Sequence, residues 1–214
     1  MAQSERINVL SSFTTENTAL VLVDHQVGTM GWAGELTSQA ERDQLRMWTL
    51  VITRFAKSAG MPIVLTSSME TQAQGPLLPE FQQLVPAEYA ARIQRTGVIN
   101  AWDDAAFANA VRATGRKKLL MGGLTTDVCL VPPALSAKAE GFDIVALFDI
   151  SAANTRLGAQ NSRDLLQQAG IPIMTVTPMI TSLLGNYQNP AAAGMFEAFE
   201  KEGVFGAFSE GNLR

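Results

Sequence analysis

The stretch Met121-Gly122-Gly123-Leu124-Thr125-Thr126-Asp127-Val128-Cys129 decides the fold prediction. It follows an apolar run, residues 118–121, that is typical of a buried strand, and it leads into residues 128–140, whose apolar spacing predicts a helix. Cys129, the only cysteine of the chain, is therefore expected at the N-terminal end of a helix. There the helix dipole and free backbone N–H groups favour the nucleophilic thiolate. The alternative is a small buried apolar residue, and position alone leaves both interpretations open.

Apolar runs and amphipathic segments alternate on both sides of this stretch. Strands are expected at 18–23, 62–66, 90–93, 118–122, 142–148 and 171–176, and helices at 37–60, 103–115, 128–140, 160–170 and 191–201, with a short one from Thr181. This alternation predicts an α/β protein, a single-domain three-layer α/β/α sandwich with a mostly parallel central sheet. We expect an N-terminal arm over residues 1–17, the sheet domain over 18–188, and a C-terminal helix and tail over 189–214.

Composition excludes several classes of function. The chain of 214 residues is 47% hydrophobic and 17% charged, as in globular proteins, and its net charge of −4 comes without a basic cluster. We therefore expect neither nucleic acid nor a membrane as a partner. No apolar stretch follows residues 1–6, so we expect no signal peptide. One cysteine cannot form an internal disulfide, which fits a reducing compartment, and a cytoplasmic location is expected.

Metal and cofactor sites are not expected either. His25 is the only histidine, so a catalytic zinc held by two or three imidazoles cannot be built from this chain alone. The Gly122-Gly123 pair fits neither a dinucleotide fingerprint nor a phosphate loop. We expect no metal and no cofactor, only a small-molecule substrate.

Three chemically useful residues follow predicted strands: Asp24, Arg95 and Cys129. Sites in open α/β sheets form at the carboxyl ends of the strands, so these side chains are expected to meet. Asp24 could accept the thiol proton of Cys129, and Arg95 could hold the Asp24 carboxylate. Each residue also has a structural alternative: Asp24 could serve a turn, and Arg95 could form a surface ion pair. For His25 we favour a structural role.

These motifs carry a family resemblance. Leu22-Val23-Asp24-His25-Gln26, the stretch 122–129 and Asp149 at the end of the next strand resemble the isochorismatase-like cysteine hydrolases over roughly residues 15–185. The segments 95–103 and 132–137 are most similar to the YcaC-type branch of that family. The resemblance implies that fold, Asp24 as base, Cys129 as nucleophile, and a cis peptide at Leu124–Thr125.

Two departures from the family pattern matter. Arg95 occupies the position where the family commonly has lysine, and arginine keeps the charge but cannot lose its proton. Nicotinamidases of the family hold a metal with several histidines, and this chain has one.

The first hypothesis is a metal-free cysteine hydrolase that cleaves a small amide or related C–N bond through a thioester. Backbone N–H groups at Leu124, Thr125 and Cys129 are the candidates for holding the oxyanion. Candidates for the pocket wall are Gln26, Glu70, Asn100 and Trp102. Two alternatives stay open: a protein that binds a small anion or serves assembly without hydrolysis, with Arg95 fixing the ligand, and a redox-active thiol protein.

Residues 189–214 contain many large apolar side chains, including Met195, Phe196, Phe199, Phe205 and Phe208. They could pack on the domain itself or on another subunit. The resemblance to the YcaC-type branch implies a closed homo-oligomer, with an octamer as the expected form, and favours the subunit interface.

Overall fold

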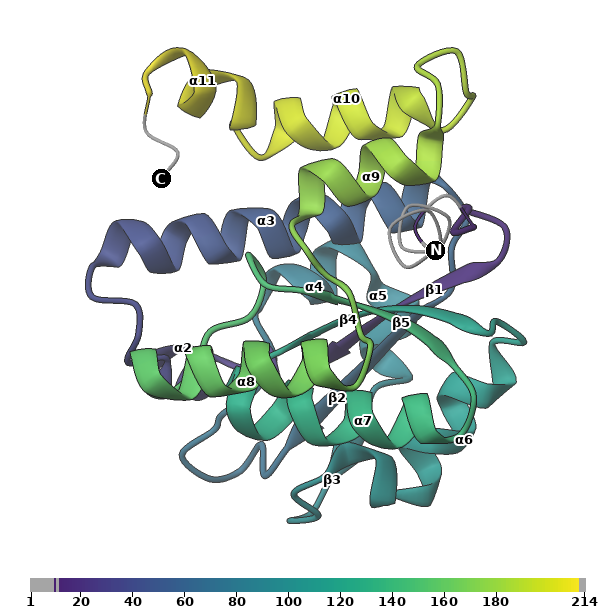
Figure 1. The fold of residues 1–214 in the computed structure, drawn as a ribbon. Helices are drawn as coiled ribbons and strands as arrows, with labels where there is room; N and C mark the ends of the chain where they lie inside the picture. The colour runs from purple at the N-terminus through teal and green to yellow at the C-terminus, as the bar shows by residue number, and fades with distance from the viewer. Residues whose placement is uncertain (1–9, 11, 212–214) are drawn as a thin grey trace.

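Six strands form one parallel sheet in the order β3-β2-β1-β4-β5-β6 (Figure 1). The computed structural model describes residue 10 and residues 12–211. The strands are β1 (Thr18–Val23), β2 (Ile63–Ser68), β3 (Ile93–Arg95), β4 (Lys118–Gly123), β5 (Asp143–Leu147) and β6 (Ile173–Met174). The register pairs Val23 with Gly123 and Ser68 with Arg95, so the carboxyl ends of β1, β2, β3 and β4 lie along one edge.

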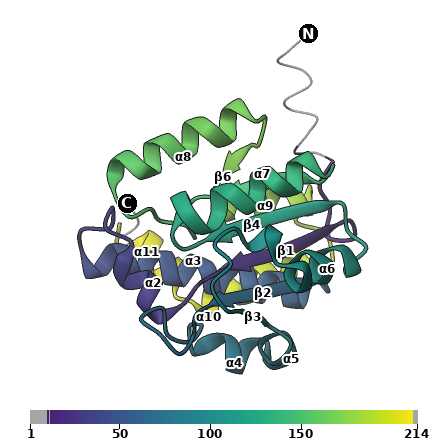
Figure 2. The same cartoon turned by 90° about the horizontal axis from the view of Figure 1, so that it is seen from below.

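Helices cover both faces of this sheet, which confirms the predicted α/β/α sandwich (Figures 1 and 2). One face is covered by α3 (Gln39–Ser58) and α9 (Val176–Leu184), with α10 (Ala192–Lys201) packed outside them, and the other by α6 (Ala105–Ala113), α7 (Val131–Ala139) and α8 (Arg156–Gln168). Shorter elements are α2 (Val27–Trp32), α4 (Glu80–Leu84), α5 (Pro86–Ala90), α11 (Val204–Ser209), the 3₁₀ turn η1 (Ala101–Asp103) and the π-helical turn η2 (Thr126–Leu130).

The central strand β1 shows why the sheet is buried on both faces. Leu20 and Leu22 belong to the core under α3 and α9, whereas Val21 and Val23 belong to the core under α6 and α7. Successive strand residues point to opposite faces, so an uninterrupted apolar run supplies both cores. The continuous apolar character of residues 18–23 thus accounts for the central position of this strand.

The long helix α3 begins as its sequence predicts. The Ser38 hydroxyl accepts a hydrogen bond from the Glu41 N–H, and the Glu41 carboxylate accepts one from the Ser38 N–H at 2.9 Å. This reciprocal capping satisfies N–H groups that have no partner inside the helix. The helix expected from residue 103 begins at Ala105 instead, because Asp104 caps it through the N–H groups of Ala106 and Phe107.

Several other boundaries differ from the sequence prediction. The helix expected over 128–140 divides into η2 and α7, and the strand expected over 171–176 pairs only at 173–174. The chain turns into α9 at Val176 because the Asp149 carboxylate accepts a hydrogen bond from the Val176 N–H at 2.8 Å. This contact between distant residues begins the helix five residues before the predicted start at Thr181.

Both terminal segments contribute to the core. Residues 1–9 and 11 of the expected arm lie outside the described residues, but Phe13 is only 1% exposed and packs in the core under α3. Helix α10 packs on α3 and buries Met195, Ala198 and Phe199. Among the helices described, none has the length and apolar character needed to cross a membrane.

Candidate active site

Asp24, Arg95 and Cys129 meet at the carboxyl edge of the sheet, as predicted. Asp24 follows β1, Arg95 ends β3, and Cys129 lies in η2 after β4. The guanidinium of Arg95 forms an ion pair with the Asp24 carboxylate, and the Cys129 thiol donates a hydrogen bond to the same carboxylate. The interpretation of Arg95 as a surface ion pair is wrong, because its side chain is only 1% exposed.

The backbone of Asp24 departs from the line of β1. Its φ angle is +58°, in the left-handed region that residues other than glycine seldom adopt and that aspartate adopts more readily than most. Its N–H donates to the Thr66 carbonyl at 2.9 Å, and its carbonyl accepts from the Thr29 hydroxyl at 2.6 Å. These two bonds hold a conformation that costs on the order of 1 kcal/mol or more.

The Arg95 side chain uses every one of its N–H groups. Nε donates to the Thr66 hydroxyl at 3.1 Å, and Nη1 donates to the carbonyls of Val98 and Ile99 at 2.6 and 3.3 Å. Nη2 donates to both carboxylate oxygens of Asp24. A guanidinium has five N–H donors, so Arg95 is saturated by the protein itself.

Cys129 is brought to the strand end by a glycine. A Cβ atom at Gly123 would lie 2.9 Å from the Cys129 carbonyl carbon, closer than side chains tolerate. Gly123 therefore allows the backbone of η2 to lie directly against the end of β4. A π-helical turn of this kind often marks a functional site, and here it carries the thiol.

Two of the three backbone oxyanion candidates donate their N–H groups to other parts of the backbone. The Leu124 N–H donates to the Val23 carbonyl at 3.0 Å and the Cys129 N–H to the Thr125 carbonyl at 2.6 Å, so the assignment of these two was wrong. Thr125 stays a candidate; it follows a parallel bridge between Leu124 and Ala152 and lines the cavity described below. The peptide bond Leu124–Thr125 is cis, as expected from the family resemblance.

The electrostatics of the site correct the expectation of a thiolate. Burial raises the pKa of the Cys129 thiol above its ordinary value, and the charge of Asp24 and its hydrogen bond raise this pKa further, against a smaller lowering by Arg95. Burial also raises the pKa of the Asp24 carboxyl, and Arg95 opposes that rise. Cys129 therefore rests as a neutral thiol, and the Asp24 carboxyl beside it is more basic than an ordinary one.

A cavity of about 250 Å³ opens at this pair. Asp24, Thr125 and Cys129 line it, together with three apolar side chains, Trp32, Ile99 and Val128. Its remaining lining is polar and uncharged: Thr29, Ser68, Gln74 and Asn154. The cavity is small and suits a correspondingly small ligand.

The four predicted pocket-wall residues do not line this cavity. The amide of Gln26 is fully used in holding the loop after β2, since it donates to the carbonyls of Ser68 and Gly75 and accepts from the Ser68 N–H at 2.9 Å. Glu70 pairs with Arg92 through two hydrogen bonds of 2.7 and 2.9 Å. Both residues support the loop instead of facing a ligand.

Asn100 and Trp102 are structural as well. Asn100 caps η1 by accepting from the Trp102 N–H at 3.1 Å, and its amide donates to the Ser136 hydroxyl at 3.1 Å. The Trp102 ring packs edge-on against Phe107 and Phe142, and its Nε1 donates to the Glu140 carboxylate at 2.9 Å. Trp102 thus belongs to the core under α6 and α7.

The cavity residues that the sequence analysis missed come from loops and short turns. Trp32 ends α2, Ile99 follows β3, and Asn154 precedes α8. The amide of Asn154 donates to the Thr125 hydroxyl at 3.2 Å. Of these residues, only Trp32 gave a signal in the sequence, as a tryptophan in a glycine-rich loop. Its side chain is 46% exposed in the structure.

His25 has the structural role that we favoured. Its Nε2 lies 2.8 Å from the Ile150 carbonyl, its ring packs edge-on against Phe81, and it does not line the cavity. Burial lowers the pKa of His25 to about 4, so the imidazole is neutral near pH 7.

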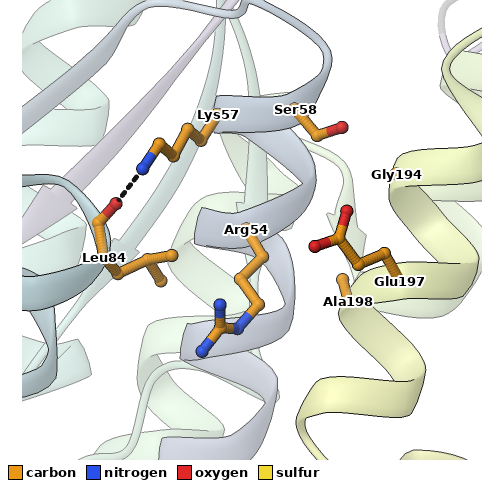
Figure 3. A pocket seen from close by; sticks show the side chains of 7 residues that line it. All are labelled: Arg54, Lys57, Ser58, Leu84, Gly194, Glu197 and Ala198. Atoms are coloured by element: carbon orange, nitrogen blue, oxygen red, sulfur yellow. Dashed lines mark hydrogen bonds between the residues drawn. The ribbon is translucent and has the colours of Figure 1, made fainter.

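A second cavity lies between α3 and α10, and its cationic side chains are already engaged (Figure 3). Lys57 donates to the Leu84 carbonyl at 2.6 Å, and Arg54 pairs with Glu202. Across residues 10 and 12–211, no three His, Cys, Asp or Glu side chains are grouped as metal ligands. The candidate catalytic side chains, Asp24 and Cys129, therefore lie at the first cavity.

A parallel α/β/α fold with a thiol, a carboxylate and a cation at the carboxyl edge defines a hydrolase of the isochorismatase type. The sequence matches the isochorismatase domain over residues 18–178, and the chain belongs to this family. It is 38% identical over 171 residues to the probable hydrolase YcaC of Escherichia coli strain K12, covering 80% of this chain and 79% of that protein.

Solved structures agree with this assignment. The crystal structure of the E. coli YcaC gene product, described as an octameric hydrolase of unknown specificity, superposes with a TM-score of 0.80 at 32% identity and covers 92% of this chain and 96% of its own. YcaC from Pseudomonas aeruginosa with hexane-2,5-diol and covalent acrylamide gives the same TM-score and coverage at 28% identity.

Proposed function

We propose that this hydrolase is a cysteine hydrolase that needs no metal and cleaves a small amide or related C–N bond. The observation that carries the proposal is the hydrogen bond from the Cys129 thiol to an Asp24 carboxylate that Arg95 holds in place. The nucleophile Cys129 and the base Asp24 line one cavity, and the orienting group Arg95 lies behind the base. Covalent catalysis requires such a nucleophile, with an oriented base beside it.

The first half of the reaction forms a thioester. Asp24 takes the thiol proton as the Cys129 sulfur attacks the carbonyl carbon, and the carbonyl oxygen becomes an oxyanion. The Thr125 N–H, at the wall of the cavity, is the proposed donor to that oxygen. When the oxyanion collapses, the C–N bond breaks, and protonated Asp24 gives its proton to the leaving nitrogen, so that ammonia or an amine departs.

The second half restores the enzyme. Asp24, again a carboxylate, removes a proton from a water molecule that attacks the thioester carbon. The C–S bond breaks, the Cys129 sulfur recovers the proton from Asp24, and a carboxylic acid is released. Arg95 exchanges no proton in either half, since it stays charged, and its part is to fix and balance the carboxylate.

The covalent acrylamide of the P. aeruginosa relative supports this mechanism, since acrylamide is an electrophile that accepts a thiolate. The geometry gives less support to the two alternatives. An Arg95 without a free N–H cannot bind a further anion, and a thiol whose pKa is raised by burial is a poor redox sensor.

The proposal is tested by measuring ammonia release from a panel of small primary amides by wild-type protein and by Cys129→Ala. We expect release by the wild type and its loss in the variant. Circular dichroism of the variant is the control for folding. Release at equal rates by both proteins would overturn the proposal.

We further propose that the chain forms a homo-oligomer whose interface includes α10 and α11. Residues Met195 and Phe199 pack on their own domain, but Phe196, Phe205 and Phe208 are 46%, 47% and 50% exposed. The rings of Phe205 and Phe208 both contact Phe199. Exposed aromatic side chains are typical of an interface, and the E. coli relative is octameric.

A further inference from the structure

The charges around the cavity restrict what it can bind. Asp24 is the only charged side chain among its lining residues in the described chain, and it is anionic. A substrate carboxylate in this space would meet a negative charge at short range. Repulsion between two carboxylates is stronger in a partly desolvated site than in water.

Arg95 balances part of the charge of Asp24, but no cation in the described site has a free N–H group to pair with a substrate carboxylate. Arg95 is the nearest one in the described site, but its five N–H groups are all donated to protein acceptors, and it does not line the cavity. A substrate anion could recruit it only by displacing Asp24 or the carbonyls of Val98 and Ile99. Displacing Asp24 would remove the base from its position.

The rest of the cavity wall favours an apolar group beside an uncharged polar group. Trp32, Ile99 and Val128 present apolar surface and are 46%, 71% and 38% exposed. Gln74 also lines the cavity, and its side-chain amide makes no hydrogen bond with the part of the chain that the structure describes. An amide pairs well with an uncharged amide of a ligand, as donor and as acceptor.

We propose that the substrate is a small uncharged carboxamide whose acyl group is apolar, with Trp32, Ile99 and Val128 contacting the acyl group. This inference rests on the proposed amide hydrolysis and adds the charge and size of the substrate. A water molecule in the liquid takes up about 30 Å³, so a cavity of about 250 Å³ holds a ligand of roughly eight to ten non-hydrogen atoms.

The test uses amides in pairs of equal size in which a carboxylate replaces an isopropyl group: succinamate with 4-methylpentanamide, and glutaramate with 5-methylhexanamide. Ammonia release gives kcat/KM for each. We expect the uncharged member of each pair to be preferred by at least ~10-fold. Equal or greater kcat/KM for the carboxylated member would overturn the inference, while hydrolysis of neither member would overturn the proposed function itself.

A charge introduced at the cavity mouth gives an independent readout. Ile99→Lys places a cation where the side chain is most exposed, and the change leaves the backbone carbonyl that Arg95 uses. Ile99→Met is the matched uncharged variant. We expect the lysine variant, and not the methionine variant, to shift the kcat/KM ratio toward the carboxylated amide by about 10-fold. An equal ratio in both variants would contradict the assignment of this residue to the substrate site.

Discussion

Nη2 of Arg95 donates to both carboxylate oxygens of Asp24, and the two side chains are only 1% and 2% exposed. Neither charge has another counterion at this position in the described chain. Removing one partner of a buried ion pair costs about 3–5 kcal/mol, because the other charge remains buried without compensation. The site therefore couples catalysis to stability through one pair of residues.

Asp24→Asn is expected to lower kcat by about 10²–10⁴-fold, since the variant has no carboxylate to accept the Cys129 proton. It should also lower the free energy of unfolding by about 3 kcal/mol or more, because Arg95 loses its counterion. Ammonia-release kinetics and urea unfolding measure the two effects. Asp103→Asn, which changes an exposed carboxylate, is the matched control. Full activity in a folded Asp24→Asn variant would remove Asp24 from the mechanism.

Alkylation of Cys129 by iodoacetamide is expected to reach half of its maximal rate above the ordinary thiol pKa of about 8.5. Burial and the charge of Asp24 both raise the pKa of this thiol. In Asp24→Asn the midpoint should move downward, because Arg95 then acts on the thiol without the opposing carboxylate. A wild-type midpoint below 8 would show a preformed thiolate and contradict this assignment.

The pKa of His25 is lowered by burial to about 4, and this predicts an acid-sensitive fold. An unfolded chain binds a proton at this residue below pH 6.5, whereas the folded chain does not until about pH 4. The free energy of unfolding is therefore unaffected by His25 above pH 6.5. It decreases as the pH falls toward 4, by on the order of 3 kcal/mol in all.

Because His25 is the only histidine, its Cε1–H resonance can be followed directly by NMR against pH. We expect a midpoint near 4 in the folded protein. A midpoint near 6.5 with the fold intact would show that the imidazole is accessible to solvent, which conflicts with its position between Ile150 and Phe81.

The double variant Phe205→Ser/Phe208→Ser is expected to lower the mass of the oligomer in light scattering. These side chains are about half exposed, so the change should leave the fold of one chain intact. Deleting residues 189–214 would be a poorer test, since α10 also covers the core of its own domain. Leu165→Ser, at an equally exposed apolar position on α8, is the control.

Two results would contradict the proposed interface. A wild-type mass equal to one 23.0 kDa chain at micromolar concentration would exclude a stable oligomer. An unchanged mass in the double variant would place the interface elsewhere.

Much of the fold could be predicted because the central strands are continuous apolar runs. Residues 18–23 and 118–122 had to lie inside a sheet covered on both faces, and the parallel arrangement then placed Asp24 and Cys129 at the same edge. The turn η2 could not be predicted, because apolar spacing does not distinguish a π-helical turn from the first turn of α7.

The cavity wall depends on contacts between distant residues, and this limits sequence reasoning. Gln26, Glu70 and Trp102 were plausible from their positions after strands, but each is engaged by a partner at least 22 residues away in the chain: Ser68, Arg92 and Glu140. Ile99 and Asn154 became wall residues only once their loops were placed in space.

Mass spectrometry of the intact protein during turnover tests the central claim, covalent catalysis by Cys129, most directly. Wild-type protein is mixed with pentanamide, quenched in acid within the first turnovers and mapped by peptide digestion. The account predicts the mass of one pentanoyl group on the peptide that contains Cys129 and no adduct in Cys129→Ala. Ammonia release from pentanamide that continues in Cys129→Ala, with no acyl group on any wild-type peptide, would contradict it.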